Sequence, residues 1–192
     1  DLAVARGCEQ IAITDHDTVA AYAELDSSTQ SIRLIKGCEF SSQWQGREIH
    51  IVGLNLDLQT TELLDGLARQ QRMRSQRAER IAAQLARLGY KDSYAGALKF
   101  ANGSGLGRPH FAHYLVEAGA VSNFQQAFKR YLAAGKPAYV RAEWANIEQV
   151  CGWIAAAGGV AVLAHPLKYK MTLTKLRSLL VAFKDVGGDG IE

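Results

Sequence analysis

Cysteine is scarce in this sequence of 192 residues, and long apolar runs are missing altogether. The three cysteines form no C-x-x-C pair, and their odd number argues against a disulfide framework or a zinc ribbon. This cysteine usage predicts a cytoplasmic protein with no disulfide partner. No apolar stretch approaches the roughly 18 residues that span a bilayer, so we expect no membrane partner for this sequence.

The start of the sequence has neither a methionine nor a signal segment. Residues 1–6 read DLAVAR, which is the pattern of the end of an amphipathic helix and not of a basic-then-apolar leader. We therefore expect the sequence to be a fragment that is truncated at both termini.

The composition is that of a globular protein, with 48% hydrophobic and 21% charged residues, and excludes a disordered tail. The net charge of +3 hides an asymmetry. Residues 61–141 hold 13 basic and 5 acidic residues, a net charge of +8, whereas the flanks together carry −5. This contrast predicts two functional parts that attract ions of opposite sign, although an arginine-rich solvated helix face would look the same.

The two flanks alternate short apolar strands with helical patterns, which is typical of an α/β fold. The middle segment instead has a helical stripe of apolar residues followed by short helices between glycines. We therefore expect residues 1–60 to form the first part of an α/β core, residues 61–141 a basic helical insertion, and residues 142–192 the second part of the core. Strands are expected at 11–14, 32–40, 48–56, 160–164 and from 190, and helices at 19–25, 94–101, 109–118, 123–133, 148–157 and 173–183.

Four residues that could bind a metal lie at or near the predicted strands of the flanks. His16 and His165 each follow a strand, Glu39 lies near the end of one, and His50 lies within one. Because the carboxyl ends of parallel strands meet on one side of a sheet, we expect the four side chains to converge there. Imidazole and carboxylate ligands suit zinc, iron or manganese.

Each candidate has a structural alternative. A single histidine beside a strand is more often a hydrogen-bonded core residue than a ligand. Asp17 is expected to cap the helix that begins near Val19. Cys38 is expected to be a small buried hydrophobic residue, and His113 a surface histidine.

Several short strings resemble one known family. Together they are similar to the PHP (polymerase and histidinol phosphatase) superfamily, and most of all to its bacterial branch of nucleoside 3′,5′-bisphosphate phosphatases and ribonuclease AM-like 5′→3′ exoribonucleases. The strings are Ile13-Thr14-Asp15-His16-Asp17-Thr18, Gly37-Cys38-Glu39-Phe40-Ser41, Glu48-Ile49-His50-Ile51-Val52-Gly53, Gly107-Arg108-Pro109-His110-Phe111-Ala112 and Ala164-His165-Pro166.

The resemblance implies a distorted seven-stranded βα barrel with a helical insertion and a cluster of two or three Mn²⁺, Fe²⁺ or Zn²⁺ ions. It implies that His16, Glu39, His50 and His165 are metal ligands, with Glu39 bridging two ions, and that His16, Glu39 and His165 are catalytic. The family's paired H-x-H and its final D-x-H are not found in residues 1–192. We therefore expect these residues alone to hold little metal and to be inactive.

The expected reaction is hydrolysis of a phosphate ester, because a metal ion supplies hydroxide at neutral pH and offsets phosphoryl charge. The expected substrate is a nucleoside 3′,5′-bisphosphate or a short 5′-phosphorylated RNA. Alternatives are a phosphatase for another monoester such as histidinol phosphate, or a non-catalytic module that binds nucleic acid or a partner. The residues expected to bind substrate are Asp15, Arg108 in its loop with Gly103, Gly105 and Gly107, His110, Lys136 and Lys168; plain surface charge is the alternative for both lysines, and helix-start packing for His110.

Overall fold

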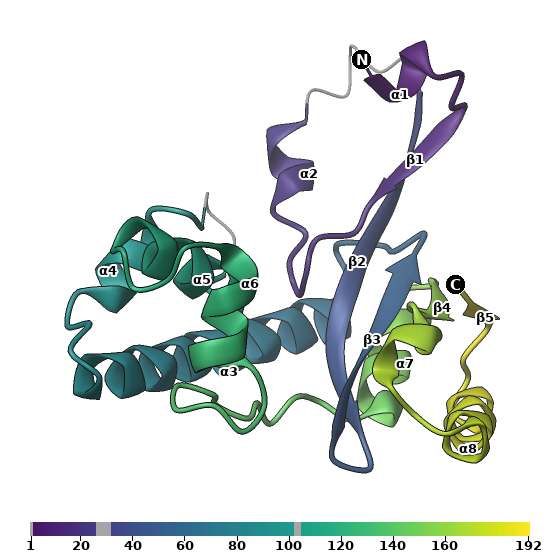
Figure 1. Ribbon diagram of the computed structural model, residues 1–192. Coiled ribbons are helices and arrows are strands. Elements are labelled where there is room, and N and C mark those ends of the chain that lie inside the picture. Colours follow the sequence, from purple (N-terminus) through teal and green to yellow (C-terminus); the bar gives the residue numbers. More distant parts are fainter. Residues whose placement is uncertain (1, 26–31, 102–104) are drawn as a thin grey trace. The chain divides into compact units, whose positions relative to one another are not determined.

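The computed structural model describes residues 2–25, 32–101 and 105–192, which form two compact units (Figure 1). The sheet unit comprises the residues up to Gln70 together with Trp144–Glu192, and the helical unit comprises Gln71–Glu143. The long helix α3 (Thr61–Arg87) contributes to both units. The first residues of α3 belong to the sheet unit, because Leu63 and Leu67 are buried in the apolar core of that unit.

The sheet unit contains an open five-stranded sheet in the order β1-β2-β3-β4-β5. The β1–β2 and β4–β5 pairs are parallel, whereas β2–β3 and β3–β4 are antiparallel. The described residues form an open sheet and not the seven-stranded barrel that the resemblance implies for the family, because β1 and β5 each pair with one neighbour and not with each other. The strands are β1 (Gln10–Ile13), β2 (Arg33–Trp44), β3 (Arg47–Leu54), β4 (Val160–Leu163) and β5 (Gly190–Ile191).

The hairpin of β2 and β3 is the centre of this sheet. Gln45 and Gly46 join the strands, with φ values of 45° and 73°, and both positive values are typical of a tight two-residue hairpin turn. Because successive side chains of a strand point to opposite faces, Phe40, Ile49 and Ile51 are all buried on one face. Figure 1 shows β2 running past β3, with β1 and α2 (Ala21–Glu24) beside its first half.

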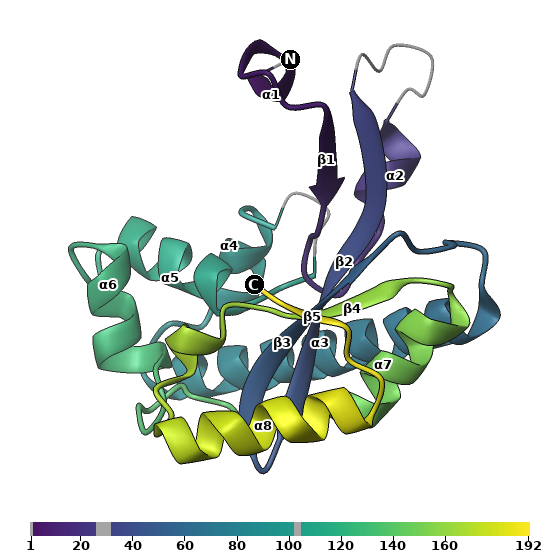
Figure 2. The ribbon, with the colours of Figure 1, turned by 90° about the vertical axis from the view of Figure 1, so that its right-hand side faces the viewer.

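The apolar face of the hairpin is covered by helices. The helices α7 (Ile147–Ala156) and α8 (Leu173–Asp185) belong to this unit (Figure 2). Their side chains Val150, Ile154, Leu179 and Phe183 belong to the same buried core as the hairpin. Each such side chain contributes about 1.5–3 kcal/mol when it is buried. The opposite face of the hairpin is therefore left for polar residues. The remaining elements of the sheet unit are α1 (Leu2–Ala5) and the 3₁₀ turn η3 (Pro166–Tyr169).

The helical unit packs around a second core that includes Ile81, Leu85, Phe111, Leu115 and Leu132. The predicted third helix of this segment is split into α6 and a π-helical turn. Among the described helices of the whole chain, none is both long and apolar enough to cross a membrane. Besides the end of α3, the elements are α4 (Ser93–Leu98), α5 (Arg108–Glu117), α6 (Phe124–Ala127) and the π-helical turn η2 (Phe128–Leu132).

Candidate metal centre

Four predicted ligands come together around the carboxylate of Glu39, and we call these four residues the Glu39 cluster. The Oε1 atom of Glu39 lies 3.1 Å from His50 Nδ1 and 3.0 Å from His165 Nε2. Its Oε2 atom lies 3.7 Å from His16 Nε2. His50 Nδ1 and His165 Nε2 are themselves 3.1 Å apart. Segments 149 residues apart in the sequence therefore meet at one carboxylate.

His16 and His165 follow the carboxyl ends of β1 and β4, as expected, but Glu39 and His50 lie on a face of the sheet and not at strand ends, so that part of the prediction was wrong. Glu39 and His50 lie inside two antiparallel strands, with Glu39 opposite Val52 and His50 opposite Ser41. By the alternation of strand side chains, Glu39 and His50 share one face. This is the face opposite the buried Phe40 and Ile51.

His16 reaches the cluster through a short bridge between the end of β1 and the middle of β2. The backbone N–H of Glu39 donates to Asp15 O (3.1 Å), and the N–H of Asp17 donates to Glu39 O (3.0 Å). These two hydrogen bonds hold His16 directly beside Glu39, as a continuation of the parallel β1–β2 register.

Asp17 fixes the loop that carries His16. Its side chain is fully buried, and its Oδ1 accepts hydrogen bonds from Ser41 N (2.7 Å) and Gln70 Nε2 (2.9 Å). The expected helix-capping role was wrong, because α2 begins at Ala21 and Asp17 is turned inward with a φ of 54°. The two donors offset the desolvation of the carboxylate, so Asp17 is a positioning residue for the cluster.

His165 enters the cluster because its backbone is left-handed. Leu163 pairs with Ile51 on the buried face, and an extended chain would direct His165 to that face as well. Its φ of 33° and ψ of 52° redirect the ring toward Glu39. A left-handed non-glycine residue costs about 1–3 kcal/mol and persists where its surroundings hold it. One such contact is the hydrogen bond from His165 N to Glu192 Oε2 (2.9 Å).

Tyr169 ties His50 and His165 together and was not found by sequence reasoning. Its hydroxyl donates to Ala164 O (2.6 Å) and accepts from His50 N (2.9 Å). Burial raises the pKa of Tyr169 to about 12, so the hydroxyl keeps its proton at neutral pH. The only signal in the sequence is a tyrosine four residues after His165.

The charge of Glu39 is stabilised by the histidines. Burial alone would raise the pKa of this carboxyl, but hydrogen bonds from His50 and His165 and the nearby charges of His16 and His50 outweigh burial and lower the pKa to about 2. Glu39 is therefore ionised over the whole physiological range and available as an anionic ligand.

The donor set fits a divalent metal ion. The ligand atoms of His16, Glu39 and His50 all lie within 4.8 Å of one another. Two ligands that are each about 2.1 Å from one ion are separated by about 3.0–3.4 Å, and the contacts of Glu39 with His50 and His165 agree with that spacing. Within the described ranges, the buried Nδ1 of His165 has no hydrogen-bond partner, which leaves it open to a further contact.

The residues expected to bind substrate are divided between the two units. Asp15 and Lys168 are exposed in the sheet unit, whereas Arg108, His110 and Lys136 belong to the helical unit. Their binding roles stay predictions.

Arg108 begins α5, directly after Gly107. His110 Nδ1 accepts from Gly107 N at 3.0 Å, which is the helix-start role weighed as its alternative. Burial, with the charges of His113 and Arg74, lowers the pKa of His110. Of the glycines in the predicted Arg108 loop, Gly103 lies outside the described residues.

The structural interpretation of Cys38 is confirmed, because its side chain is fully buried and its sulfur lies 3.5 Å from Asp15 O. His113 is exposed, as expected, and stacks on Phe100 with ring centroids 5.4 Å apart. Neither residue contributes to the Glu39 cluster.

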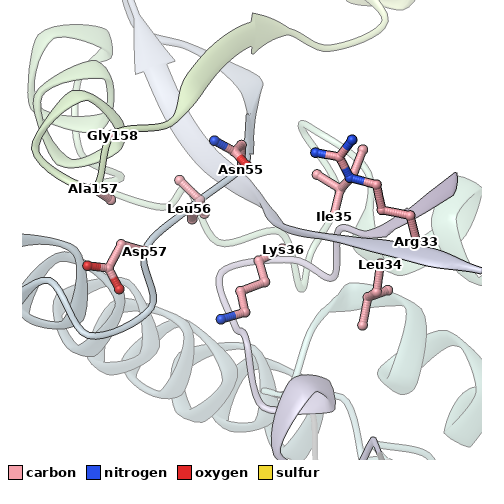
Figure 3. Close-up of a pocket in the computed structure, with 9 residues that line it drawn as sticks. All are labelled: Arg33, Leu34, Ile35, Lys36, Asn55, Leu56, Asp57, Ala157 and Gly158. Carbon is pink, nitrogen blue, oxygen red and sulfur yellow. The ribbon is translucent and has the colours of Figure 1, made fainter. Parts of the chain in front are cut away.

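A pocket of about 490 Å³ opens where β2 extends beyond the end of β3 (Figure 3). Arg33 and Lys36 of β2 and Asn55 and Asp57 after β3 contribute its polar side chains. None of the predicted site residues lines this pocket, so the Glu39 cluster lies outside it.

Comparison with known proteins places the whole chain among bacterial hydrolases, although no family model matches it. It is 47% identical over 192 residues to a 5′-3′ exoribonuclease of Haemophilus influenzae, covering 99% of this chain and 70% of the relative. It is 42% identical over 186 residues to the 5′-3′ exoribonuclease Rnm of Escherichia coli, covering 95% of this chain and 64% of the relative. A 3′,5′-nucleoside bisphosphate phosphatase of Chromobacterium violaceum is 38% identical over 195 residues, with 100% and 68% covered.

Two solved structures share the fold. An amidohydrolase structure from Chromobacterium violaceum with bound sulfate and no metal superposes with a TM-score of 0.91 at 38% identity, covering 98% of this chain and 68% of that one. A Bifidobacterium adolescentis structure described as a metal-dependent phosphoesterase has a TM-score of 0.88 at 26% identity, with 100% and 68% covered. The chain therefore belongs to the PHP-like phosphoesterase family that contains the bacterial 5′-3′ exoribonucleases and 3′,5′-nucleoside bisphosphate phosphatases.

Proposed function

We propose that this chain is the larger part of a metal-dependent phosphoesterase that removes the 3′-phosphate of nucleoside 3′,5′-bisphosphates and releases nucleotides from the 5′ end of short RNA. The observation that carries the proposal is the convergence of three imidazoles on the ionised carboxylate of Glu39. The activities for which the relatives are named support the choice of substrate.

The proposed metal ligands are His16, Glu39, His50 and His165, with Glu39 as the bridging carboxylate. Mn²⁺ is the proposed ion, with Fe²⁺ or Zn²⁺ as alternatives, and the complete protein would hold two or three ions. A bound divalent ion makes hydroxide available from water near neutral pH and offsets charge on the phosphoryl oxygens. The chain's own contribution is to keep Glu39 ionised and to hold the four ligands in place through Asp17 and Tyr169.

The proposed substrate ligands come from both units. Lys168 on η3 and Asp15 beside His16 are near the cluster in the sequence, and Arg108, His110 and Lys136 come from the basic segment 61–141. The planar fork of Arg108 suits two oxygens of one phosphate. We propose that this segment is an insertion into the core that binds the phosphate left uncleaved, and that the enzyme acts in the cytoplasm.

The test combines metal analysis with turnover. The full-length protein, purified after growth with Mn²⁺, is analysed for metal and then assayed for phosphate release from a nucleoside 3′,5′-bisphosphate and from histidinol phosphate, and for nucleotide release from a 5′-phosphorylated RNA. We expect bound metal and turnover of the bisphosphate and the RNA. Metal-dependent turnover of histidinol phosphate alone would contradict the proposal.

The Arg108→Ala variant sharpens this test. Losing a charge-assisted contact worth about 1.5–3 kcal/mol raises KM for the bisphosphate about ten- to a hundredfold. Metal content should be unchanged, because Arg108 is not a proposed ligand. Arg87→Ala, an exposed arginine in the same unit, is the matched control and should leave KM as it is.

A further inference from the structure

A second polar pocket, of about 530 Å³, lies in the helical unit, where the chain leaves α6 through the turn η2. Its lining consists of Gln126, Lys129, Arg130, Tyr131 and Lys136. Three of these five side chains are cations and none is a carboxylate. The pocket contains no histidine, cysteine or acidic residue that could hold a metal, so its chemistry differs from that of the Glu39 cluster.

The surroundings of the pocket are also positive. The helical unit contains 12 basic and 4 acidic residues, a net charge of +8. Within the described part of the chain, neither Lys129 nor Lys136 forms an ion pair, and both are exposed. Their ammonium groups can therefore be attracted to a polyanion without breaking an existing contact.

The backbone brings the cations to one place. Ala133 N donates to Phe128 O (2.9 Å), which closes the wide π-helical turn that carries Lys129 and Arg130. Ala138 N then donates to Tyr131 O (2.9 Å), and Gly135 has a φ of 77°, so the chain folds back and returns Lys136 to the same pocket. A π-helical turn is rare and often marks a functional site.

Arg130 and Tyr131 also give this positively charged pocket two planar groups, a guanidinium and an aromatic ring. The guanidinium of Arg130 lies over the Tyr131 ring, 5.5 Å from its centroid, and Arg130 Nη1 donates to Ala120 O (3.2 Å). The Tyr131 hydroxyl is hydrogen-bonded to that of Tyr90 (3.0 Å). Both planar groups are thus fixed, and single-stranded nucleic acids bind to such combinations of cations and aromatic rings by phosphate contact and base stacking.

We propose that this pocket, which we call the Lys129 pocket, binds the body of a single-stranded RNA substrate, downstream of the 5′ nucleotide that is removed. The inference rests on the proposed function and adds to it a second, non-catalytic contact for RNA. A nucleoside bisphosphate has only two phosphates and does not need Lys129 or Arg130. The pocket therefore distinguishes the two proposed substrates by their length.

The test uses the full-length protein and a double variant, Lys129→Ala with Arg130→Ala, because Lys136 is also a proposed ligand of the bisphosphate. Binding to a fluorescent 5′-phosphorylated RNA of about 12–16 nucleotides is measured by anisotropy in the presence of EDTA, which prevents cleavage. Each phosphate contact on a single strand contributes about 0.7 to the salt slope, so losing two contacts lowers the slope of log Kd against log salt concentration by about 1.4. At physiological salt this corresponds to a roughly tenfold weaker Kd.

The matched control is Lys91→Ala with Lys99→Ala, which removes two exposed lysines of the same unit outside the pocket. We expect it to bind RNA like the unchanged protein, and we expect Lys129→Arg with Arg130→Lys to keep the affinity. Phosphate release from the bisphosphate should have the same kcat/KM in every variant. This assay separates the two ideas, because failed bisphosphate turnover in the unchanged protein overturns the proposed function and leaves the anisotropy result standing.

Three outcomes would overturn the Lys129 pocket as an RNA site. Unchanged RNA affinity in the double alanine variant would show that the pocket binds something else or nothing. An equal loss of RNA affinity in the Lys91 and Lys99 control would show that the effect comes from the overall charge of the unit and not from the pocket. A parallel loss of kcat/KM for the bisphosphate would assign Lys129 and Arg130 to the catalytic site instead.

Discussion

The sheet unit and the helical unit differ in how they hold charged side chains. The sheet unit has 10 basic and 15 acidic residues, a net charge of −5, and its key carboxylates, Glu39 and Asp17, are held by ladder hydrogen bonds and buried donors. The helical unit is +8, and its lysines are exposed on helices and turns. Metal ligation requires fixed atoms, whereas attraction of a polyanion works through long, mobile side chains. The four predictions below test this difference, from the largest effect to the smallest.

Replacing the shared carboxylate should have the largest effect. Glu39→Gln removes the negative charge that three histidines contact, and losing several kcal/mol of charge stabilisation slows turnover at least about a thousandfold. Metal content of the full-length protein should fall with it, while RNA binding in EDTA stays unchanged. Glu62→Gln, an exposed residue at the start of α3, serves as the control. Full metal content and activity in Glu39→Gln would show that the Glu39 cluster is not the metal site.

Asp17→Asn should affect the metal site indirectly. The change weakens the charge-assisted hydrogen bonds to Ser41 and Gln70. We expect metal affinity to fall about ten- to a hundredfold, as for other residues that orient ligands, and the free energy of unfolding to fall by about 1.5–3 kcal/mol. Metal titration and urea unfolding measure the two effects. Asp57→Asn, which changes an exposed aspartate of the same unit, should alter neither.

A packing change in the helical unit should leave the metal site intact. A Cβ atom at Gly96 would lie 2.1 Å from the Tyr114 ring, so Gly96→Ala is expected to lower the free energy of unfolding by about 1–3 kcal/mol. A Cβ at Gly152 of α7 has no atom within 4 Å, and Gly152→Ala should stabilise the protein by up to about 1 kcal/mol. If Gly96→Ala reduced metal content at unchanged stability, the separation of the two units would be wrong.

The smallest expected effect is a difference in how fast the three cysteine thiols react. It involves no change in stability or metal affinity. All three cysteines lie in the sheet unit, with Cys8 exposed and Cys38 and Cys151 buried. Burial, with the charge of Asp189, raises the pKa of Cys151 to about 12, so its thiol stays protonated at pH 8. We expect iodoacetamide to label Cys8 rapidly, and the other two only as the sheet unit unfolds and exposes their thiols, when the pKa of Cys151 returns to about 8.5. Mass spectrometry of labelled peptides during urea unfolding would follow that unit alone.

The sequence was sufficient to predict most of the elements. The strand expected at 48–56 is confirmed as β3, because the alternation of Ile49 and Ile51 is a local signal. The glycine at position 46 is likewise a local signal, typical of the turn that precedes this strand. Strand direction was not predictable in this way. The expectation that the candidate ligands meet at the carboxyl ends of parallel strands was wrong for Glu39 and His50, because β2–β3 and β3–β4 are antiparallel and alternation is the same in both kinds of ladder.

The residues that meet in the candidate site could be predicted from the sequence, but the residues that hold them in place could not. The side chains of Glu39, His50 and His165 were selected correctly as a group that meets, although the reason given was partly wrong. The positioning roles of Asp17 and Tyr169 were not predicted, because they depend on contacts with residues 53 and 119 positions away in the sequence. The left-handed backbone of His165 likewise has no signature in hydrophobic periodicity.

The two-residue turn at Gln45 and Gly46 has a consequence for how this protein can change during evolution. Strand side chains alternate with a period of two, so adding or deleting one residue between Glu39 and His50 while keeping the ladder would direct one of them to the apolar core. The length of an exposed loop is thereby constrained as strictly as the identity of a ligand. Insertions and deletions in this hairpin should survive only in pairs or as bulges, whereas substitutions at Gln45 should be tolerated wherever the new residue accepts a positive φ.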